Sequence, residues 1–521
     1  MKTKTSTIRV GALKKAVVSL TIFLLCVCLT SCSGKEPSTR RVSEKLIDQI
    51  DVSRWLEKTL RISPDGTRIA YVATAGNKRF LVVDGQPQKQ YDEIFQRDIV
   101  FSPNGRQFAY AARLDGNYFF VLDGQEQAPY AKIGIGSVTF SPDSEHIAYV
   151  ARKGDKWFIV ADGIEQKQYD SILWRTPVFS PDSKRMAYAA EEGQKWFWVL
   201  DGQEQQQYDA VGPTDFTFSP DSRHFAYSAK RGEKWFVVVD EKEHQQHDVI
   251  GNGSITFSPD AESLAYAAKS EDRIFLVVNG EEQDSYDNIK TQTLVFSPDG
   301  ESLAYVAAAD HKWFVVHNGK EHKRYDKIVE GPVFSPQSAD IAYAAQKANK
   351  CFAIVNDTEQ KQYDDVRKGP VFSPDGEHTA YIAWDEGKWL VVVDGNESDR
   401  FNNVVKAPVF SPGGEHMAYA ARIGLKRFVV LDGERGREYD SIFRSPVFSP
   451  DGEHVAYVAK RGDKKFAVAD GEKGREYDNI LSVGNICIIF DSNDTFHYLA
   501  VKGNNIYLVQ EQIEVHRSPS L

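Results

Sequence analysis

One stretch of about forty residues recurs along almost the whole chain, and this repetition limits the possible folds more than any other feature. In the copy at residues 138–172 it reads VTFSPDSEHIAYVARKGDKWFIVADGIEQKQYDSI. A Ser-Pro pair marks each copy, and its period is 39 residues for the first six steps and 38 for the last four. The prolines are Pro64, Pro103, Pro142, Pro181, Pro220, Pro259, Pro298, Pro336, Pro374, Pro412 and Pro450. A fixed period of about 20 to 50 residues is typical of solenoids, propellers and arrays.

Each copy carries four short strand signals and no helical period. Residues 138–140 form a β-rich run that ends in the tight turn of residues 141–144, where Pro presets φ at the second turn position. Two runs that are apolar on both faces follow, and Asp162-Gly163 is a strong hairpin signal before a return strand expected at residues 168–172. A small sheet that is apolar on both faces must be covered on both sides. Sheets packed face to face around an axis meet this need, so the sequence predicts an all-β fold, a β-propeller.

The number of rings is a separate question. Eleven clear copies are followed by a degenerate twelfth at residues 488–516. Known propellers typically have four to eight blades. We therefore expect two six-bladed propellers in tandem, at residues 60–292 and 293–521, with the seam where the period changes. A seven-plus-five division and one giant ring remain open as alternatives.

The N-terminal region has the features of an export signal. Residues 1–15 are basic, and residues 16–29 form an apolar run that is too short to span a bilayer. Residues 29–32, Leu-Thr-Ser-Cys, resemble the lipobox of bacterial lipoproteins. The resemblance implies a signal peptide at residues 1–31 and a diacylated Cys32, and Ser33 at the next position implies the outer membrane, facing the periplasm or the cell surface.

Residues 32–59 are expected to form the lipid anchor, a tether and a short N-terminal segment. A short helix from residue 43 is one possibility for this segment. The other is that Gln49-Ile50-Asp51, which echoes the repeated Gln-Tyr-Asp, helps to close a ring. The sequence leaves this choice open.

Most of the chemically interesting side chains occur once in nearly every copy. A catalytic group is needed only once, so the repeated Tyr-Asp pair and Trp are interpreted as structural residues. The position after the turn holds His in some copies and Arg or Ser in others, which suggests a solvated position. No Gly-x-Ser-x-Gly elbow or glycine-rich phosphate loop is present. Cys351 and Cys487 lie in different copies and are expected to be two thiols. The sequence thus predicts neither an enzyme nor a metal or cofactor site.

Charge and loop composition suggest where a partner would bind. Residues 32–521 hold 58 Lys and Arg against 74 Asp and Glu, which argues against nucleic-acid binding. The loops between the second and third strands are basic, and the Ser-Pro turns are acidic, so a basic rim is expected on an acidic body. An exposed Trp beside Arg is a frequent interface anchor. The partner-binding candidates come from the loops between copies: Arg97, Trp174, Arg175, Arg367, Lys368, Lys406 and Arg444.

The repeated Phe-Ser-Pro-Asp-Gly-x-x-x-Ala-Tyr resembles the TolB-like, WD-type β-propeller repeat proteins over roughly residues 60–509. The resemblance implies a platform for protein interactions in the cell envelope. The expected function is therefore a lipid-anchored, non-enzymatic scaffold that binds an envelope protein or another acidic ligand. The alternative is a carbohydrate-binding or glycan-processing propeller, for which Trp174 and Trp384 are the only aromatic hints.

Overall fold

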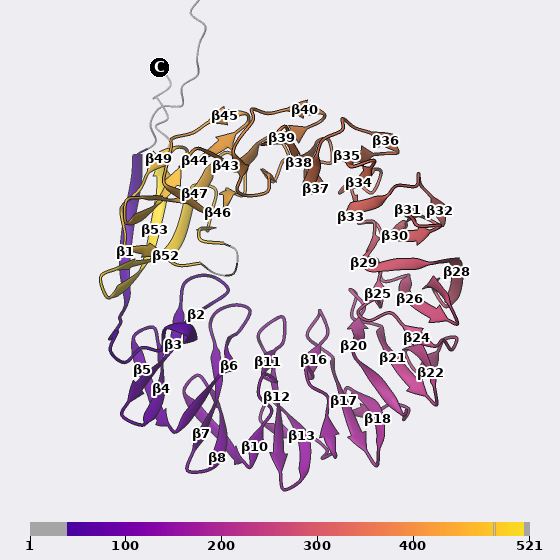
Figure 1. Ribbon diagram of the computed structural model, residues 1–521. Coiled ribbons are helices and arrows are strands. Elements are labelled where there is room, and N and C mark those ends of the chain that lie inside the picture. The colour runs from indigo at the N-terminus through magenta and orange to yellow at the C-terminus, as the bar shows by residue number, and fades with distance from the viewer. Residues whose placement is uncertain (1–38, 483, 485, 515–521) are drawn as a thin grey trace, which may run out of the picture. The chain divides into compact units, whose positions relative to one another are not determined.

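A computed structural model describes residues 39–514 except 483 and 485, so the predicted signal peptide and Cys32 lie outside the described residues. The described chain folds into twelve antiparallel sheets that follow one another around a ring (Figure 1). The one helical element in this part of the chain is a single 3-10 turn, Glu57–Thr59. None of the helices described there is long and apolar enough to cross a membrane. The predicted all-β propeller fold is confirmed.

Each sheet forms one blade, whose strands follow one another from the innermost to the outermost. Blades 1 to 4 comprise β2 (Arg61–Ile62), β3 (Ile69–Ala75), β4 (Lys78–Val83) and β5 (Gln86–Tyr91); β6 (Glu93–Phe101), β7 (Phe108–Leu114), β8 (Asn117–Leu122) and β9 (Gln125–Tyr130); β10 (Lys132–Ile133) with β11 (Thr139–Phe140), β12 (Ile147–Lys153), β13 (Lys156–Ala161) and β14 (Ile164–Glu165); and β15 (Ser171–Ile172) with β16 (Val178–Phe179), β17 (Met186–Glu192), β18 (Lys195–Leu200) and β19 (Gln203–Glu204).

Blades 5 to 8 comprise β20 (Ala210–Phe218), β21 (Phe225–Arg231), β22 (Lys234–Val239) and β23 (Lys242–Glu243); β24 (Val249–Ile250) with β25 (Thr256–Phe257), β26 (Leu264–Ser270), β27 (Arg273–Val278) and β28 (Glu281–Tyr286); β29 (Asn288–Phe296), β30 (Leu303–Ala309), β31 (Lys312–His317) and β32 (Lys320–Glu321); and β33 (Lys327–Phe334), β34 (Ile341–Lys347), β35 (Lys350–Val355) and β36 (Thr358–Glu359).

Blades 9 to 12 comprise β37 (Asp365–Phe372), β38 (Thr379–Asp385), β39 (Lys388–Val393) and β40 (Asn396–Glu397); β41 (Asn403–Val404) with β42 (Val409–Phe410), β43 (Met417–Ile423), β44 (Lys426–Leu431) and β45 (Glu434–Arg435); β46 (Ser441–Phe448), β47 (Val455–Arg461), β48 (Lys464–Ala469) and β49 (Glu472–Lys473); and β50 (Asn479–Ile480) with β51 (Ile489–Phe490), β52 (Thr495–Lys502), β53 (Asn505–Glu514) and β1 (Thr39–Gln49).

One strand boundary differs from the expectation. The return strand predicted at residues 168–172 ends at Tyr169, which bridges Trp157 of its own blade. Ser171 and Ile172 instead pair with Glu191 and Ala190 of the next blade. The outermost strand of one blade and the innermost strand of the next therefore meet directly at the Tyr-Asp pair.

The expected division into two six-bladed propellers is not confirmed, because the apolar cores continue around a single ring. One core joins blade 6 to blade 7, with the Tyr286 and Phe314 ring centroids 5.5 Å apart. Another joins blade 12 to blade 1 through Leu499 and Ile69. The proposed seam between residues 292 and 293 falls inside β29, the innermost strand of blade 7. Residues 38–521 form one compact unit.

The change of period has a local cause. In blades 1 to 7 the innermost strand is interrupted by a bulge of four residues, whereas in blades 8 to 11 the corresponding bulge has three residues. All seven longer bulges contain a Ser, Thr or Asp at the equivalent position of the repeat: Thr59, Asp98, Ser137, Thr176, Asp215, Ser254 and Thr293. A one-residue deletion in a bulge changes the spacing without changing the blade, so the period change does not mark a domain boundary.

The N-terminal segment closes the ring as a strand rather than a helix. β1 pairs with β53 from Thr39↔Glu514 to Gln49↔Asn505 and forms the outermost strand of blade 12 (Figure 1). Asp48 pairs with Ile506, which is the place that Tyr169 takes opposite Trp157 in the regular blades. The whole of β1, rather than Gln49-Ile50-Asp51 alone, therefore closes the ring. The residue at the place of the repeated Tyr is Asp48, two residues before the Ile50 that the sequence similarity suggested.

The Tyr-Asp pair fastens each blade to the next. Asp170 Oδ1 accepts a hydrogen bond from Lys156 Nζ of its own blade at 2.5 Å, and its Oδ2 accepts one from the Gly193 amide of the following blade at 2.9 Å. The Lys156 ammonium and the Gly193 amide together lower the pKa of the Asp170 carboxyl. The Lys–Asp ion pair recurs as Lys78–Asp92, Lys195–Asp209, Lys234–Asp248, Lys312–Asp326, Lys350–Asp364, Lys426–Asp440 and Lys464–Asp478. These repeated carboxylates are structural, as predicted.

Candidate functional site

The seven partner-binding candidates lie along the innermost strands, at the inner edge of the blades: six lie in the bulges, and Arg367 directly precedes one and pairs with Ile382. They form two groups by blade. Arg97 belongs to the bulge of blade 2, and Trp174 and Arg175 belong to that of blade 4. Arg367 and Lys368, Lys406, and Arg444 follow in blades 9, 10 and 11. The sequence predicted loops between copies at these positions, and the structure places them along the innermost strands of the blades.

The first group surrounds a hollow of about 430 Å³ between blades 2, 3 and 4. Arg97 of blade 2 lines it together with Trp174 and Arg175 of blade 4, and Ile135 lines it from the intervening blade 3. Trp174 is 59% exposed and Ile135 is 50% exposed, so both present apolar surface to solvent. The hollow combines apolar surface with two cationic side chains, which is the composition of an interface anchor.

Local backbone geometry sets the position of Trp174 and Arg175. Leu173 N donates to Ala189 O at 2.8 Å where the bulge begins, and the Thr176 hydroxyl donates to Leu173 O at 2.6 Å where it ends. Between these two bonds Arg175 adopts a left-handed φ of 67°, and its guanidinium lies 4.3 Å from the centroid of the Trp174 ring. A cation this close to an indole face is attracted by the ring quadrupole. The stacked pair therefore presents a flat surface that is apolar and positively charged.

A buried carboxylate holds the middle bulge of the hollow. Asp98 is fully buried, and its Oδ1 accepts a hydrogen bond from the Gly136 amide of the next blade at 2.6 Å. Burial raises the pKa of the Asp98 carboxyl to about 6, although the surrounding amides oppose this shift. Gly136 has a φ of 81°, which favours glycine, so that its amide can point at the carboxylate. Asp98 thereby fixes the bulge that carries Ile135.

Most residues of the second group form hydrogen bonds or ion pairs with neighbouring residues. Arg367 pairs with Asp365 at 2.6 Å and lies 5.4 Å from the Trp389 ring centroid. The Lys368 amide donates to Glu330. Arg444 donates to the Ser482 hydroxyl at 3.3 Å.

The other cation of this group, Lys406, acts on the same buried thiol as Arg444. Burial raises the pKa of the Cys487 thiol, whereas Arg444 and Lys406 lower it. Cys487 and the buried Cys351 are free thiols, as expected. Arg444 and Lys406 thus both act on the Cys487 thiol, and none of the second group lines the hollow between blades 2, 3 and 4.

The basic rim expected from the loops is neutralised in part. The lysine that ends eight of these loops, such as Lys156, pairs with a Tyr-Asp carboxylate. Neither Arg97 nor Arg175 forms a hydrogen bond or an ion pair with any other residue of the described chain, although the charge of Arg97 also lowers the pKa of the neighbouring Asp98. Arg97 and Arg175 therefore present unpaired positive charge at the hollow.

The repeated histidines form hydrogen bonds to an Asp of the hairpin in their own blade. His146 Nδ1 lies 2.8 Å from Asp162 Oδ2, and this hydrogen bond raises the pKa of His146. Seven blades pair a His or Arg with an Asp: Arg68–Asp84, His146–Asp162, Arg185–Asp201, His224–Asp240, His378–Asp394, His416–Asp432 and His454–Asp470. Where the first residue is Ser263, Ser302 or Asp340, the second is Asn279, Asn318 or Asn356. The two positions change together because they bond each other.

The described residues contain one group of three side chains whose ligand atoms lie within 4.8 Å of one another, Asp375, Glu377 and His378. Asp375 accepts a hydrogen bond from the Ser373 hydroxyl, and His378 Nδ1 lies 2.7 Å from Asp394. Asp375 therefore bonds within the turn and His378 bonds to the hairpin, so this group is best explained by the structure of the blade.

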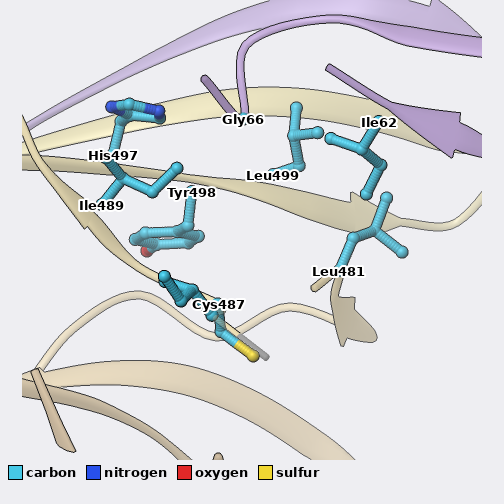
Figure 2. A pocket seen from close by; sticks show the side chains of 9 residues that line it. Ile62, Gly66, Leu481, Cys487, Ile489, His497, Tyr498 and Leu499 are labelled. Atoms are coloured by element: carbon cyan, nitrogen blue, oxygen red, sulfur yellow. The ribbon is translucent and has the colours of Figure 1, made fainter. Parts of the chain in front are cut away.

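The junction of blades 12 and 1 encloses a cavity of about 10 Å³, roughly the space of one water molecule. Figure 2 shows Ile62, Leu481 and Leu499 facing it, with His497 and Cys487 at its borders. His497 Nδ1 contacts Asp491, and its Nε2 contacts Asp65 O of blade 1 at 2.8 Å. This cavity is part of the ring closure and is too small for a ligand.

Two residues that shape the hollow, Ile135 and Asp98, were not predicted from the sequence. Both belong to a pattern that the sequence contains, in which an Asp ends one bulge and Gly-x-Gly-Ser forms the next. It occurs at residues 98 and 134–137, and again at residues 215 and 251–254. The two aromatic hints of a glycan site, Trp174 and Trp384, lie in blades 4 and 9 and are not brought together.

Comparison with known proteins adds little beyond the fold. No family model and no curated protein matches the chain. A crystal structure described as the eukaryotic initiation factor is 14% identical, with a TM-score of 0.33, over 65% of this chain and 96% of its own. TolB from Acinetobacter baumannii is 11% identical, with a TM-score of 0.24, over 55% of this chain and 78% of its own.

The β-propeller domain of the Trilobed protease from Pyrococcus furiosus is 14% identical, with a TM-score of 0.25, over 51% of this chain and 96% of its own. Values this low carry no argument about function. The resemblance to TolB-like proteins is therefore limited to the fold, and the twelve sheets themselves identify the chain as a β-propeller.

Proposed function

We propose that this protein is a lipid-anchored, non-enzymatic scaffold of the bacterial cell envelope, which binds a protein partner through the bulges at the inner edge of its blades. The partner carries negative charge where it meets the protein. The outer membrane is the proposed location, and Cys32 is the proposed site of lipidation.

The hollow between blades 2, 3 and 4 is the observation that carries this proposal. Exposed Trp174 and Ile135 lie beside two arginines that have no ion-pair partner among the described residues. The repeated Asp, Lys and His side chains, in contrast, are committed to bonds within and between blades. A surface that combines exposed apolar side chains with unpaired arginines is the natural place for a partner.

The proposed anchor agrees with the length of the tether. The ring begins with β1 at Thr39, seven residues after Cys32. Seven extended residues reach at most about 25 Å. Acyl chains on Cys32 would therefore hold the ring close to the membrane surface.

Capture of a partner from envelope extracts tests the proposal. The full-length protein serves as bait, and a variant carries Arg97→Thr, Trp174→Thr and Arg175→Gln. We expect the variant to retain less than about a tenth of the captured partner, because truncating a central aromatic and its flanking arginine typically costs about 2 kcal/mol or more, roughly a 30-fold loss of affinity.

Two controls separate the causes of a loss. Arg106→Thr removes an exposed cation of a Ser-Pro turn and should leave capture unchanged. Cys32→Ser should release the protein from the membrane fraction while the purified protein still captures the partner. Equal capture by the triple variant and the unsubstituted protein would refute the role of the hollow, and membrane retention of Cys32→Ser would refute the anchor.

A further inference from the structure

Blades 2 to 4 and blades 5 to 7 share one design in their bulges. Residues 95–98, 134–137 and 173–176 read FQRD, GIGS and LWRT, and residues 212–215, 251–254 and 290–293 read GPTD, GNGS and KTQT. Each triplet has an Asp at the end of its first bulge, Gly-x-Gly-Ser as its second, and a Thr at the end of its third. The sequence thus places the same three features three blades apart.

The shared residues make the same contacts in both triplets. The Asp215 carboxylate accepts from the Gly253 amide, as Asp98 does from Gly136. The remaining bonds also match: Ser137 to Gly134 O and Ser254 to Gly251 O, both at 2.6 Å, and Thr176 to Leu173 O and Thr293 to Lys290 O at 2.6 and 2.7 Å. These residues build the bulges, so both triplets have the same scaffold.

The residues that line the hollow are those in which the triplets differ. The pairs are Arg97 and Thr214, Ile135 and Asn252, Trp174 and Thr291, and Arg175 and Gln292. In blades 5 and 6, the Thr214 hydroxyl donates to Asn252 Oδ1 at 2.5 Å. Because the scaffold accepts neutral polar residues in one triplet, it does not require arginine, isoleucine and tryptophan in the other.

The four side chains of the hollow have a defined order. Arg97 comes from blade 2, Ile135 from blade 3, and Trp174 and Arg175 from blade 4. Ile135 therefore lies between Arg97 and the stacked pair of Trp174 and Arg175. A matching ligand has an apolar group between two anions. Its apolar group would then lie on the apolar side chains of the hollow, and its anions would lie on the arginines.

We propose that the hollow binds a protein segment that presents one apolar or aromatic side chain flanked by two carboxylates. The apolar side chain packs on Trp174 and Ile135, and the carboxylates pair with Arg97 and Arg175. This inference rests on the proposed scaffold function and specifies the chemistry of its partner.

A matrix of peptides and variants tests the proposal. The probe is acetylated, amidated Glu-Gly-Phe-Gly-Glu, because alternate side chains of an extended segment point to the same face. The comparison peptides are Gln-Gly-Phe-Gly-Gln and Glu-Gly-Ala-Gly-Glu, and binding to the full-length protein in detergent is followed by fluorescence anisotropy of a labelled peptide. We expect the probe to bind at least about 10-fold more tightly than either comparison peptide.

The residues at the equivalent positions of blades 5 to 7 give the matched substitutions for the variants. Arg97→Thr with Arg175→Gln should abolish the preference for Glu over Gln and keep that for Phe over Ala. Ile135→Asn with Trp174→Thr should do the reverse. The opposite exchange, Thr214→Arg, Asn252→Ile, Thr291→Trp and Gln292→Arg, should raise the stoichiometry from one peptide to two.

Unchanged far-ultraviolet circular dichroism and thermal midpoint would show that the variants are folded. Equal binding of the three peptides to the unsubstituted protein, or preferences that survive both variants, would overturn this inference. If partner capture still depends on Arg97, Trp174 and Arg175 in that case, the scaffold function stands and only the chemistry of the partner is wrong. If the peptide preferences are absent and partner capture also does not depend on these three residues, the scaffold function and the proposed chemistry of the partner are both wrong.

Discussion

Replacing Arg40 by alanine is expected to lower the free energy of unfolding by about 3–5 kcal/mol, because it leaves a buried carboxylate without its counter-ion. Arg40 of β1 lies 2.9 Å from Glu511 of β53, and the two side chains are 6% and 0% exposed. The Tyr498 hydroxyl donates to the other carboxylate oxygen at 2.6 Å. Burial raises the pKa of Glu511, and the Arg40 guanidinium opposes this rise. Urea unfolding followed by tryptophan fluorescence measures the loss.

Neighbouring residues give the controls for this prediction. Arg41 pairs with Glu514 but is 79% exposed, so Arg41→Ala should cost less than about 1 kcal/mol. The double variant Arg40→Leu, Glu511→Leu should recover most of the stability, since it removes both charges together. A loss below about 1 kcal/mol for Arg40→Ala, the size expected of an exposed pair, would mean that the pair is not buried at a closed blade.

Replacing Trp198 by alanine should cost about 3–5 kcal/mol, because it empties the largest buried side-chain volume between two blades. Trp198 of β18 is fully buried, and its ring centroid lies 4.6 Å from that of Phe216 and 4.9 Å from that of Phe225, both in blade 5. Thermal and urea unfolding of the variant measure the loss. Trp198→Phe should recover part of it.

The same strand provides a matched control. Trp196 is only partly buried and lies two residues before Trp198, so Trp196→Ala removes an equal volume from a more open site. We expect it to cost less than half as much. Equal losses for the two variants would argue against blade-to-blade packing as the main source of stability.

Much of the fold is predictable because eleven clear copies of the repeat show the same local rules. The Ser-Pro turn, the Asp-Gly hairpin and the doubly apolar strands each act within about forty residues, and all were found as predicted. The number of rings was not predictable in this way. Closure depends on pairing residues 39–49 with residues 505–514, a contact between the two ends of the chain that no local pattern records.

The candidate site was predictable in its residues but not in its geometry. Residues that recur in most copies were assigned to the scaffold. The candidates were therefore sought among residues that vary between copies, which include Arg97, Trp174 and Arg175. It could not show that bulges of blades 2, 3 and 4 meet at one hollow, or that Ile135 lies exposed at that hollow. That meeting depends on Asp98, whose carboxylate reaches into the next blade.

The central claim is that twelve blades form one ring closed by β1, and a disulfide between the two ends of the chain tests it most directly. Arg41 and Gln512 are exposed and lie directly opposite each other on β1 and β53. Facing residues of antiparallel strands have Cα atoms about 4.5–5.5 Å apart, within the range of a disulfide. In the oxidised Arg41→Cys, Gln512→Cys protein, peptide mass mapping should find residues 41 and 512 joined within one chain. If the chain formed two six-bladed rings, β1 would close on residues before 293, and the absence of the 41–512 link would contradict the single ring.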